Sequence, residues 1–450
     1  MGYRIVRLLI RVLLRLFYRR IELVNGERIP SRGPLIIAAN HNNALIDPML
    51  VMVAVPRPIR ALAKAQLFHH PLVGPFLRLA GAVPVNRRLE AGDDPKRNEA
   101  MFAAAIDTLR EGGALLIFPE GVSQARPTLL PLRTGAARML LGAEAGDRRS
   151  GMTLLPVGLV FDEPGTFRAA SALVSIGRPI AVEDCVERYA AEPEASVRTI
   201  TERLATAIRE QLIEADDQYT LELLGALERA WREEHGSPAD PRTALAWKQD
   251  VMRGAARLAK DHPERVRAFR GRLERYRHRL RDTGLSEAQI GQPYTPGLVL
   301  RYVVENVVAL VVTFPLAVWG MICYAAPYFM TARVVRWLVR TPEEDATNKI
   351  ATGVVLYPVV WAVEGWLVWT LAGGSAVIAF LVLLAPSGVL ALAWRERVAR
   401  VGRQVRAFSR FVRNRQLHDD VRAERRALLR ELAHLADLAA AAPGPGSPAA

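Results

Sequence analysis

The chain has 450 residues, half of them hydrophobic, and a formal net charge of +14. This length has room for two or three domains. The two cysteines, Cys185 and Cys323, lie far apart and argue against a disulfide framework or a cysteine metal site. The sequence also lacks the catalytic Gly-x-Ser-x-Gly elbow, the phosphate-binding Gly-x4-Gly-Lys loop and zinc signatures. The basic charge predicts an anionic partner, either a nucleic acid or a phospholipid surface.

Residues 1–20 are predicted to form an amphipathic helix in the membrane interface. Arginines recur every three or four residues, which places them on one helical face, at positions 4, 7, 11, 15 and 19. A transmembrane span would not carry an arginine at every turn, and a signal peptide would have an uninterrupted apolar core. The alternative is a helix that packs on the neighbouring domain with a solvated basic face.

Residues 21–215 alternate between strand and helix patterns. Helices are predicted at 94–111, before Gly112-Gly113, and at 134–145. Short apolar runs typical of buried strands lie at 34–39, 59–63, 82–85, 114–118, 153–161 and 172–176. This alternation predicts an α/β domain with a mostly parallel sheet and flanking helices.

The remainder of the chain is predicted to be helical. Residues 216–296 are charged and rich in Ala, Arg and Glu, which is typical of a linker of solvated helices. Residues 297–394 are predicted to form a membrane block with two or three apolar helices. The stretch 306–330 carries no charge, and the apolar stretch 350–394 is expected to fold as a hairpin near Gly373-Gly374.

The segment after Trp394 holds twelve arginines and four acidic residues through Arg430, a net charge of +8. The positive-inside rule predicts a basic cytoplasmic helix over 395–437. The Ala, Pro, Gly and Ser residues of 438–450 predict a disordered tail. Because both sides of the membrane block are basic, an even number of spans is favoured. The proline-broken stretch 306–330 is then the candidate for a re-entrant or interfacial segment.

The first candidate site is the stretch Asn40 to Pro48, which follows a predicted strand and contains His41 and Asp47. A neutral imidazole can take a proton from a hydroxyl while a carboxylate fixes its tautomer. Active sites of open α/β sheets lie where strands give way to loops. Two interpretations are open, a catalytic pair or a loop whose aspartate begins a helix.

Three further stretches also follow or contain predicted strands. A strand that ends in Arg87 and Arg88 offers a forked anion site. Phe118 to Ser123 contains a Pro-Glu-Gly turn, and Leu155 to Gly158 contains a proline-fixed bend. Taken singly, each of these has a structural explanation.

Together, these blocks resemble the glycerophospholipid acyltransferases, the family of lysophosphatidic acid and glycerol-3-phosphate acyltransferases. The family motifs are N-H-x4-D, G-x-I-x-x-x-R, F-P-E-G-T-R-S and a V-P-V-type strand. They correspond in order to residues 40–47, 81–87, 118–123 and 155–158, and the resemblance covers residues 20–215. Lys64 also follows the family.

Two departures from the family motifs indicate a branch. Five residues separate His41 from Asp47, where most of the family has four, and Val122-Ser123 stands in place of Thr-Arg. Both features resemble the yeast-type glycerol-3-phosphate and dihydroxyacetone-phosphate acyltransferases. The missing arginine leaves the acceptor contact open, with Arg126 and Arg133 as candidates.

The resemblance implies an acyltransferase domain over 21–215 that moves a fatty acyl group to a hydroxyl of a glycerol-phosphate acceptor. His41 is implied as the general base and Asp47 as the residue that orients it. The residues implied in acceptor binding are Lys64, Arg87, Arg88, Glu120, Gly121 and Ser123, with Arg87 as the main phosphate ligand. No cofactor and no metal is implied, because acyl-CoA or acyl-carrier protein is a co-substrate.

The implied setting is phospholipid biosynthesis at the inner, cytoplasmic membrane, with the catalytic domain on the cytoplasmic side. The implied partners are an anionic phospholipid membrane, an acyl thioester and a phosphate-bearing acceptor. A nucleic-acid partner is disfavoured because the basic residues flank apolar spans and line an amphipathic helix. The alternatives are a lysophosphatidic acid acyltransferase and a degenerate, non-enzymatic membrane protein.

Overall fold

The fold is that of a computed structural model of the chain. It describes residues 2–69, 73–85, 95–124, 128–144, 151–161, 171–215, 217–236, 240–283, 287, 290, 296–338, 345–413 and 415–441. The chain divides into two compact units. The first comprises Met1–Leu221, Asp240–Gln249 and Val339–Ala351, and the second comprises Glu222–Ala239, Asp250–Leu338 and Thr352–Ala450.

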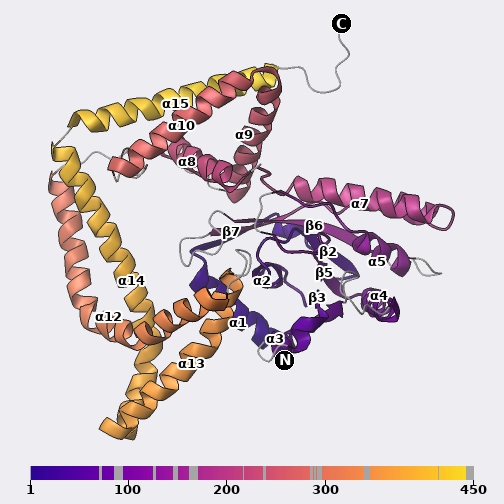
Figure 1. The fold of residues 1–450 in the computed structure, drawn as a ribbon, viewed down its shortest axis with the longest axis horizontal. Coiled ribbons are helices and arrows are strands. Elements are labelled where there is room, and N and C mark those ends of the chain that lie inside the picture. The colour runs from indigo at the N-terminus through magenta and orange to yellow at the C-terminus, as the bar shows by residue number, and fades with distance from the viewer. Residues whose placement is uncertain are drawn as a thin grey trace. The chain divides into compact units, whose positions relative to one another are not determined.

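A seven-stranded sheet forms the centre of the first unit (Figure 1). In spatial order its strands are β1 (Arg20–Val24), β7 (Ser171–Ile176), β6 (Thr153–Phe161), β2 (Leu35–Ala39), β5 (Ala114–Ile117), β3 (Arg60–Lys64) and β4 (Val83–Val85). The strands from β6 to β4 run parallel, and β7 pairs antiparallel with β6. The predicted mostly parallel sheet is confirmed, and its six predicted strands lie within one residue of their expected bounds.

Helices cover both faces of this sheet because its central strands are buried on both sides. Leu35 and Ile37 of β2 point into one core, and Ile36 points into the other. The first core is closed by α1 (Gly2–Phe17) and α2 (Ile46–Ala54), and the second by α4 (Pro95–Arg110), α5 (Gly135–Glu144) and α7 (Pro193–Arg209). Shorter helical segments connect these layers: η1 (Gly26–Arg28), η2 (Ala65–His69), α3 (Val73–Leu79) and α6 (Glu183–Arg188).

The edge strand β1 was not predicted from the sequence. It pairs parallel with β7, and of its residues only Val24 is buried. An edge strand is covered on few sides, so it lacks the continuous apolar run that marks β2 or β6.

Helix α1 has two apolar stripes, of which one is buried and the other is exposed. One stripe packs into the core of the first unit: Val6, Ile10, Leu14 and Phe17. The other stripe stays exposed: Ile5, Leu8, Leu9, Val12 and Leu16. Packing on the domain therefore leaves a second apolar face free beside the arginine face.

The helical part of the second unit lies along α10 (Pro263–Thr283) and α15 (Arg415–Ala441), together with parts of α8 (Gln218–His235) and α9 (Pro241–Asp261) (Figure 1). An ion pair of 2.8 Å between Arg279 and Glu424 joins α10 to α15. The predicted helical region after the α/β domain is confirmed. Helix α15 runs to Ala441, four residues into the segment expected to be disordered, and the later residues lie outside the described part.

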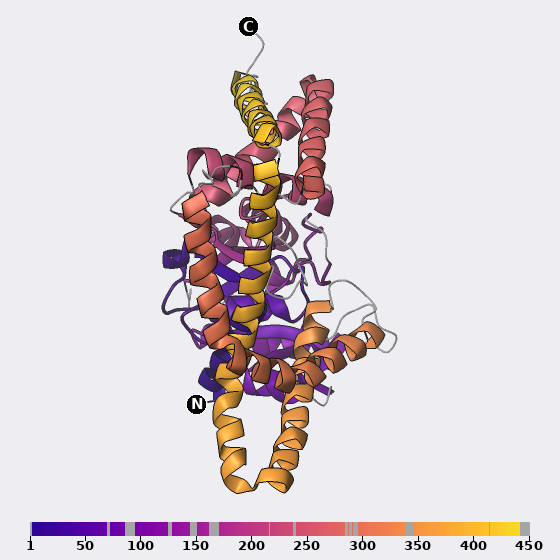
Figure 2. The ribbon, with the colours of Figure 1, turned by 90° about the vertical axis from the view of Figure 1, so that its left-hand side faces the viewer.

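Three helices are long and apolar enough to cross a membrane, judged by length and composition: α12 (Pro296–Leu338), α13 (Asp345–Ala372) and α14 (Gly374–Arg413). Gly373, at φ +82°, separates α13 from α14 at the position where the sequence predicts a turn. Helix α12 runs beside α14 in both views (Figures 1 and 2). The indole Nε1 of Trp394 donates to the carbonyl oxygen of Leu310 across this pair at 3.0 Å.

Candidate active site

The candidate site lies at the carboxyl ends of two adjacent strands. β2 is followed by residues 40–45 and β5 by residues 118–124, and the two strands pair in parallel. Parallel strands place their carboxyl ends at the same edge of a sheet. The first and third motifs, whose residues His41 and Glu120 are 79 positions apart in the sequence, therefore meet.

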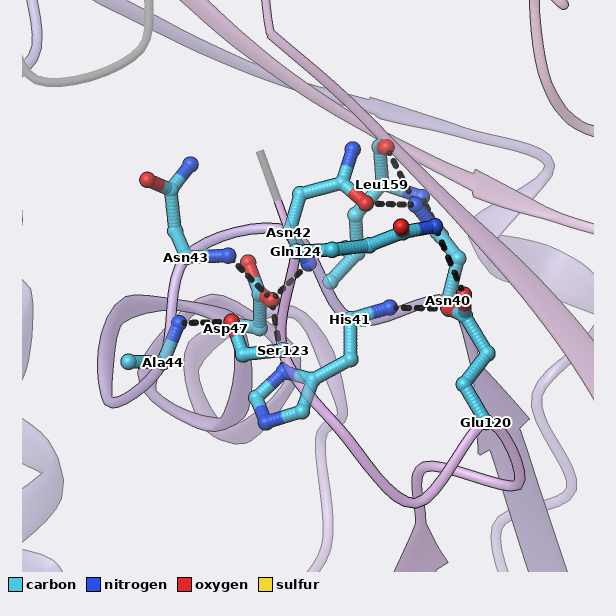
Figure 3. A network of polar contacts seen from close by, with 10 residues as sticks. All are labelled: Asn40, His41, Asn42, Asn43, Ala44, Asp47, Glu120, Ser123, Gln124 and Leu159. Atoms are coloured by element: carbon cyan, nitrogen blue, oxygen red, sulfur yellow. Dashed lines mark hydrogen bonds and ion pairs between the residues drawn. The ribbon is translucent and has the colours of Figure 1, made fainter. Parts of the chain in front are cut away.

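His41 and Asp47 form a hydrogen-bonded pair (Figure 3). The imidazole Nδ1 lies 2.8 Å from Asp47 Oδ2, with Asp47 fully buried and the His41 side chain 15% exposed. The same oxygen accepts hydrogen bonds from the backbone N–H groups of Asn42 and Asn43, at 2.6 and 2.7 Å. Asp47 lies in the first turn of α2. The helix begins at Ile46 and has no side-chain cap, so Asp47 does not cap it, and its carboxylate is instead hydrogen-bonded to His41.

The pair fixes which nitrogen of His41 is available. An ionised carboxylate only accepts hydrogen bonds, so Nδ1 carries the proton and Nε2 has the free lone pair. Nε2 has no hydrogen-bond partner within the described residues and points away from Asp47 (Figure 3). The ring stacks on Phe118, with centroids 4.2 Å apart. In its neutral form, the imidazole is held in an orientation that lets Nε2 accept a proton.

The loop after β5 forms hydrogen bonds with both the backbone N–H and the backbone carbonyl oxygen of His41. The N–H of His41 donates to Glu120 Oε1 at 2.7 Å, and the N–H of Gln124 donates to the carbonyl oxygen of His41 at 2.9 Å. The other oxygen of Glu120 accepts from the N–H of Leu130 at 3.0 Å. Burial raises the pKa of Glu120, while the hydrogen bonds from Leu130 and His41 oppose this shift. The carboxylate thus ties the loops of the site together.

Asn40 attaches the start of the site to strand β6. Its side-chain oxygen accepts from the N–H of Leu159 at 2.7 Å, and its amide nitrogen donates to the carbonyl oxygen of the same residue at 3.0 Å. Through these two hydrogen bonds, the Asn40 side chain extends the pairing of β2 with β6 beyond the end of β2. The role was not assigned from sequence, although Asn40 opens the first motif.

Tyr18 is a second residue that the sequence does not reveal. It directly follows α1, its side chain is buried, and its hydroxyl has no partner within the described residues. Burial, and to a smaller extent the charge of Asp47, raise the pKa of Tyr18. Its position in the arginine-rich N-terminal segment gave no signal of a location near Asp47.

The structure brings five of the predicted site residues together: His41, Asp47, Glu120, Gly121 and Ser123. Lys64 ends β3, the neighbour of β5, and its side chain is exposed. Arg87, Arg88 and Arg126 lie outside the described residues. No group of His, Cys, Asp or Glu that could hold a metal ion is present in the described part of the chain.

Arg133 lies directly over Gly121. A Cβ on Gly121 would lie 2.6 Å from Nε of the flexible Arg133 side chain, and φ +74° at Gly121 favours glycine there. The Arg133 side chain is exposed, and its guanidinium has no hydrogen bond or ion pair among the residues that the structure describes.

Comparisons with known proteins match the part of the chain that contains this site. The acyltransferase family model matches residues 20–160. Glycerol-3-phosphate O-acyltransferase 2 of Saccharomyces cerevisiae is 29% identical over 61% of this chain and 39% of its own length. A 1-acyl-sn-glycerol-3-phosphate acyltransferase of Borreliella burgdorferi is 30% identical over 35% of this chain and 58% of its own length. The chain therefore spans less than two thirds of each of these curated relatives.

A crystal structure of a 1-acyl-sn-glycerophosphate acyltransferase from Thermotoga maritima aligns with 20% identity and a TM-score of 0.36, over 46% of this chain and 78% of that one. The motif resemblance found in the sequence is confirmed by the family match, whose range of residues 20–160 contains His41 and Asp47. Residues 20–160 match the acyltransferase family model, and the relatives of this chain include proteins named as glycerol-3-phosphate and 1-acyl-sn-glycerol-3-phosphate acyltransferases.

Proposed function

We propose that the chain is a membrane-bound O-acyltransferase that acylates a hydroxyl of a glycerol-phosphate acceptor. The observation that supports this most directly is the hydrogen-bonded pair of His41 and Asp47, with Nε2 of His41 directed away from the carboxylate. The acyl donor is acyl-CoA or acyl-carrier protein. The step serves phospholipid biosynthesis.

The transfer is direct. Nε2 of His41 takes the proton of the acceptor hydroxyl as its oxygen forms a bond to the thioester carbonyl carbon. The C–S bond then breaks, and the leaving thiolate takes the proton back from the imidazolium. Asp47 stabilises the imidazolium through the 2.8 Å contact to Nδ1. No covalent acyl-enzyme is needed, so holding the two substrates in line supplies much of the rate.

The acceptor phosphate binds to basic side chains at the carboxyl edge of the sheet. Arg87 is the main proposed ligand, with Arg88 and Lys64 beside it. Arg133 takes the place of the arginine that the third motif lacks, because its guanidinium lies over Gly121 and is free of other ion pairs in the described residues. Guanidinium groups suit bidentate contacts to phosphate.

Glycerol 3-phosphate or dihydroxyacetone phosphate is the proposed acceptor. The support is the similarity to a yeast protein named as a glycerol-3-phosphate O-acyltransferase over more than half of this chain. A second candidate acceptor is 1-acyl-sn-glycerol 3-phosphate, since the Borreliella relative is named for that substrate.

We infer that the protein lies at the inner, cytoplasmic membrane with its acyltransferase domain on the cytoplasmic side. Three apolar helices are long enough to span. An even number of spans, with residues 306–330 re-entrant or interfacial, keeps the acyltransferase domain and the segment after Trp394 on one side. The exposed apolar stripe of α1 lies beside its arginines, which suits an interface with anionic phospholipid. The positive charge of the segment after Trp394 supports a cytoplasmic position for it.

The test is acyl transfer by the purified full chain in lipid nanodiscs. Radiolabelled glycerol 3-phosphate, dihydroxyacetone phosphate and lysophosphatidic acid are each offered with acyl-CoA and with acyl-carrier protein. His41→Ala is expected to lower turnover by about 10³-fold. The matched control is His262→Ala, since His262 is an exposed histidine of the helical part. Near-normal turnover of His41→Ala would contradict the mechanism.

A further inference from the structure

The two departures from the family motifs touch each other in the structure. One is the extra residue between His41 and Asp47, and the other is Ser123 in place of arginine. The backbone N–H of Ala44, inside the longer loop, donates to Ser123 Oγ at 2.9 Å (Figure 3). The two positions are 79 residues apart in the chain. Their direct contact suggests that the two changes belong together.

The backbone of the longer loop explains why the contact is needed. The N–H groups of Asn42 and Asn43 both point to Asp47 Oδ2, whereas the N–H of Ala44 turns to the loop after β5. Ala44 has φ +33°, in the left-handed region that residues with a Cβ rarely adopt. Such a conformation persists only where surrounding contacts hold it. Ser123 supplies one such contact.

Ser123 also lies on the loop that fixes the histidine itself. Its neighbour Gln124 donates to the carbonyl oxygen of His41, and Glu120 accepts from the N–H of the same residue. Loss of the hydrogen bond between Ala44 and Ser123 therefore affects the position of His41 in two ways. One is through the loop that leads to Asp47, and the other is through the loop that carries Ser123.

We propose that Ser123 is a positioning residue that holds Ala44, and that the serine and the longer loop form a matched pair. This proposal rests on the proposed acyl-transfer function and adds to it. In this pair the serine oxygen serves the protein rather than the acceptor phosphate. The longer loop keeps His41 and Asp47 in contact only while Ala44 stays in its left-handed conformation.

The proposal predicts a specific kinetic pattern. Ser123→Ala is expected to lower kcat about fivefold to tenfold, the usual effect of losing one neutral hydrogen bond, with the KM for the acceptor unchanged. Ser123→Thr keeps the hydroxyl and is expected to restore most of the rate. Ala44→Gly, added to Ser123→Ala, is expected to recover part of the loss, because glycine adopts positive φ without strain.

A second measurement does not depend on activity. Hydrogen–deuterium exchange of the full chain in nanodiscs is followed in the peptide that covers residues 42–46. Ser123→Ala is expected to speed exchange there severalfold, and Ser123→Thr to reverse the change. Unchanged exchange, or a raised acceptor KM with unchanged kcat, would overturn the proposal in favour of a substrate contact. Absence of acyl transfer by the wild type would count against the proposed function alone, because exchange still decides the role of Ser123.

Discussion

Replacing Asp47 by asparagine separates the charge of the catalytic pair from its geometry. Asp47 Oδ2 accepts from Asn42, Asn43 and His41, whereas Oδ1 is buried with no partner in the described residues. Two backbone N–H groups directed at one position hold the amide oxygen of an asparagine there, because the amide NH2 would meet donors. The imidazole then keeps its tautomer, and only the negative charge is lost.

The size of the effect follows from the ion pair formed during transfer. Unit charges about 4 Å apart are worth about 4 kcal/mol at an effective dielectric constant of about 20. Losing this stabilisation of the imidazolium lowers kcat by about 10³-fold, at about 1.4 kcal/mol per factor of ten. Asp47→Ala also removes the acceptor of both backbone N–H groups, so it is expected to be worse and to lower the stability of the domain.

The assay is the kcat of acyl transfer by full-length protein in nanodiscs, with the donor and acceptor that the wild type uses best. Asp184→Asn is the matched control, because Asp184 lies in α6 and pairs with exposed arginines away from the site. Equal thermal unfolding midpoints for Asp47→Asn and wild type would show that the fold is kept. Asp47→Asn at near wild-type kcat would refute the formation of an imidazolium beside this carboxylate.

Arg133→Ala is expected to raise the KM for the phosphate acceptor about tenfold or more with little change in kcat, seen in initial rates at varied acceptor concentration. Glu120→Gln places an amide NH2 against a backbone donor, so we expect a loss of about 1–3 kcal/mol of stability, measured by thermal unfolding. Gly158→Ala would set a Cβ 2.4 Å from the carbonyl oxygen of Gln211, and the same measurement should show a loss of about 1–3 kcal/mol. Burial raises the pKa of Glu287 from 4.5 to about 7, so the folded chain keeps a proton that the unfolded chain releases in this window. Stability therefore falls by up to about 3 kcal/mol as pH rises through that window, and Glu287→Gln should abolish the fall in unfolding midpoint between about pH 5 and about pH 8.

The sheet was predictable because its central strands are buried on both faces. Each of the six predicted strands is a short apolar run between turn residues, and the bounds agree with the structure. The strand order is a different matter, because the neighbours of a strand are set by tertiary packing and leave no local pattern. β2 and β5 are neighbours although β3 and β4 lie between them in sequence.

The residues of the site could be found from motifs, but their contacts could not. The contact of Ala44 with Ser123 and that of His41 with Glu120 both depend on β2 lying beside β5. The longer spacing of the first motif and the serine in the third motif were visible in the sequence as two separate departures. Only the strand order shows that the two positions are in contact.

Helix α1 shows a related limit of periodicity. The sequence predicts one arginine face with apolar residues elsewhere, and it left membrane contact and domain packing as alternatives. The structure divides the apolar residues between a buried stripe and an exposed one. Which of two apolar stripes is buried depends on where β1 leads the chain next, and the hydropathy pattern carries no information about that.

The two loops of the site act as one structural unit, and this bears on how its variants combine. Three hydrogen bonds and a ring stack join residues 41–44 to residues 118–124. Residues that share partners show interaction energies, so their effects do not add. Glu120→Gln weakens the contact that fixes the backbone of His41, so the position of His41 is already disturbed. Removal of the Ser123 hydroxyl then has a smaller additional effect on that position. The double variant Glu120→Gln with Ser123→Ala is therefore expected to lose less activity than the product of the single losses. Independent roles in binding the acceptor would instead give losses that multiply.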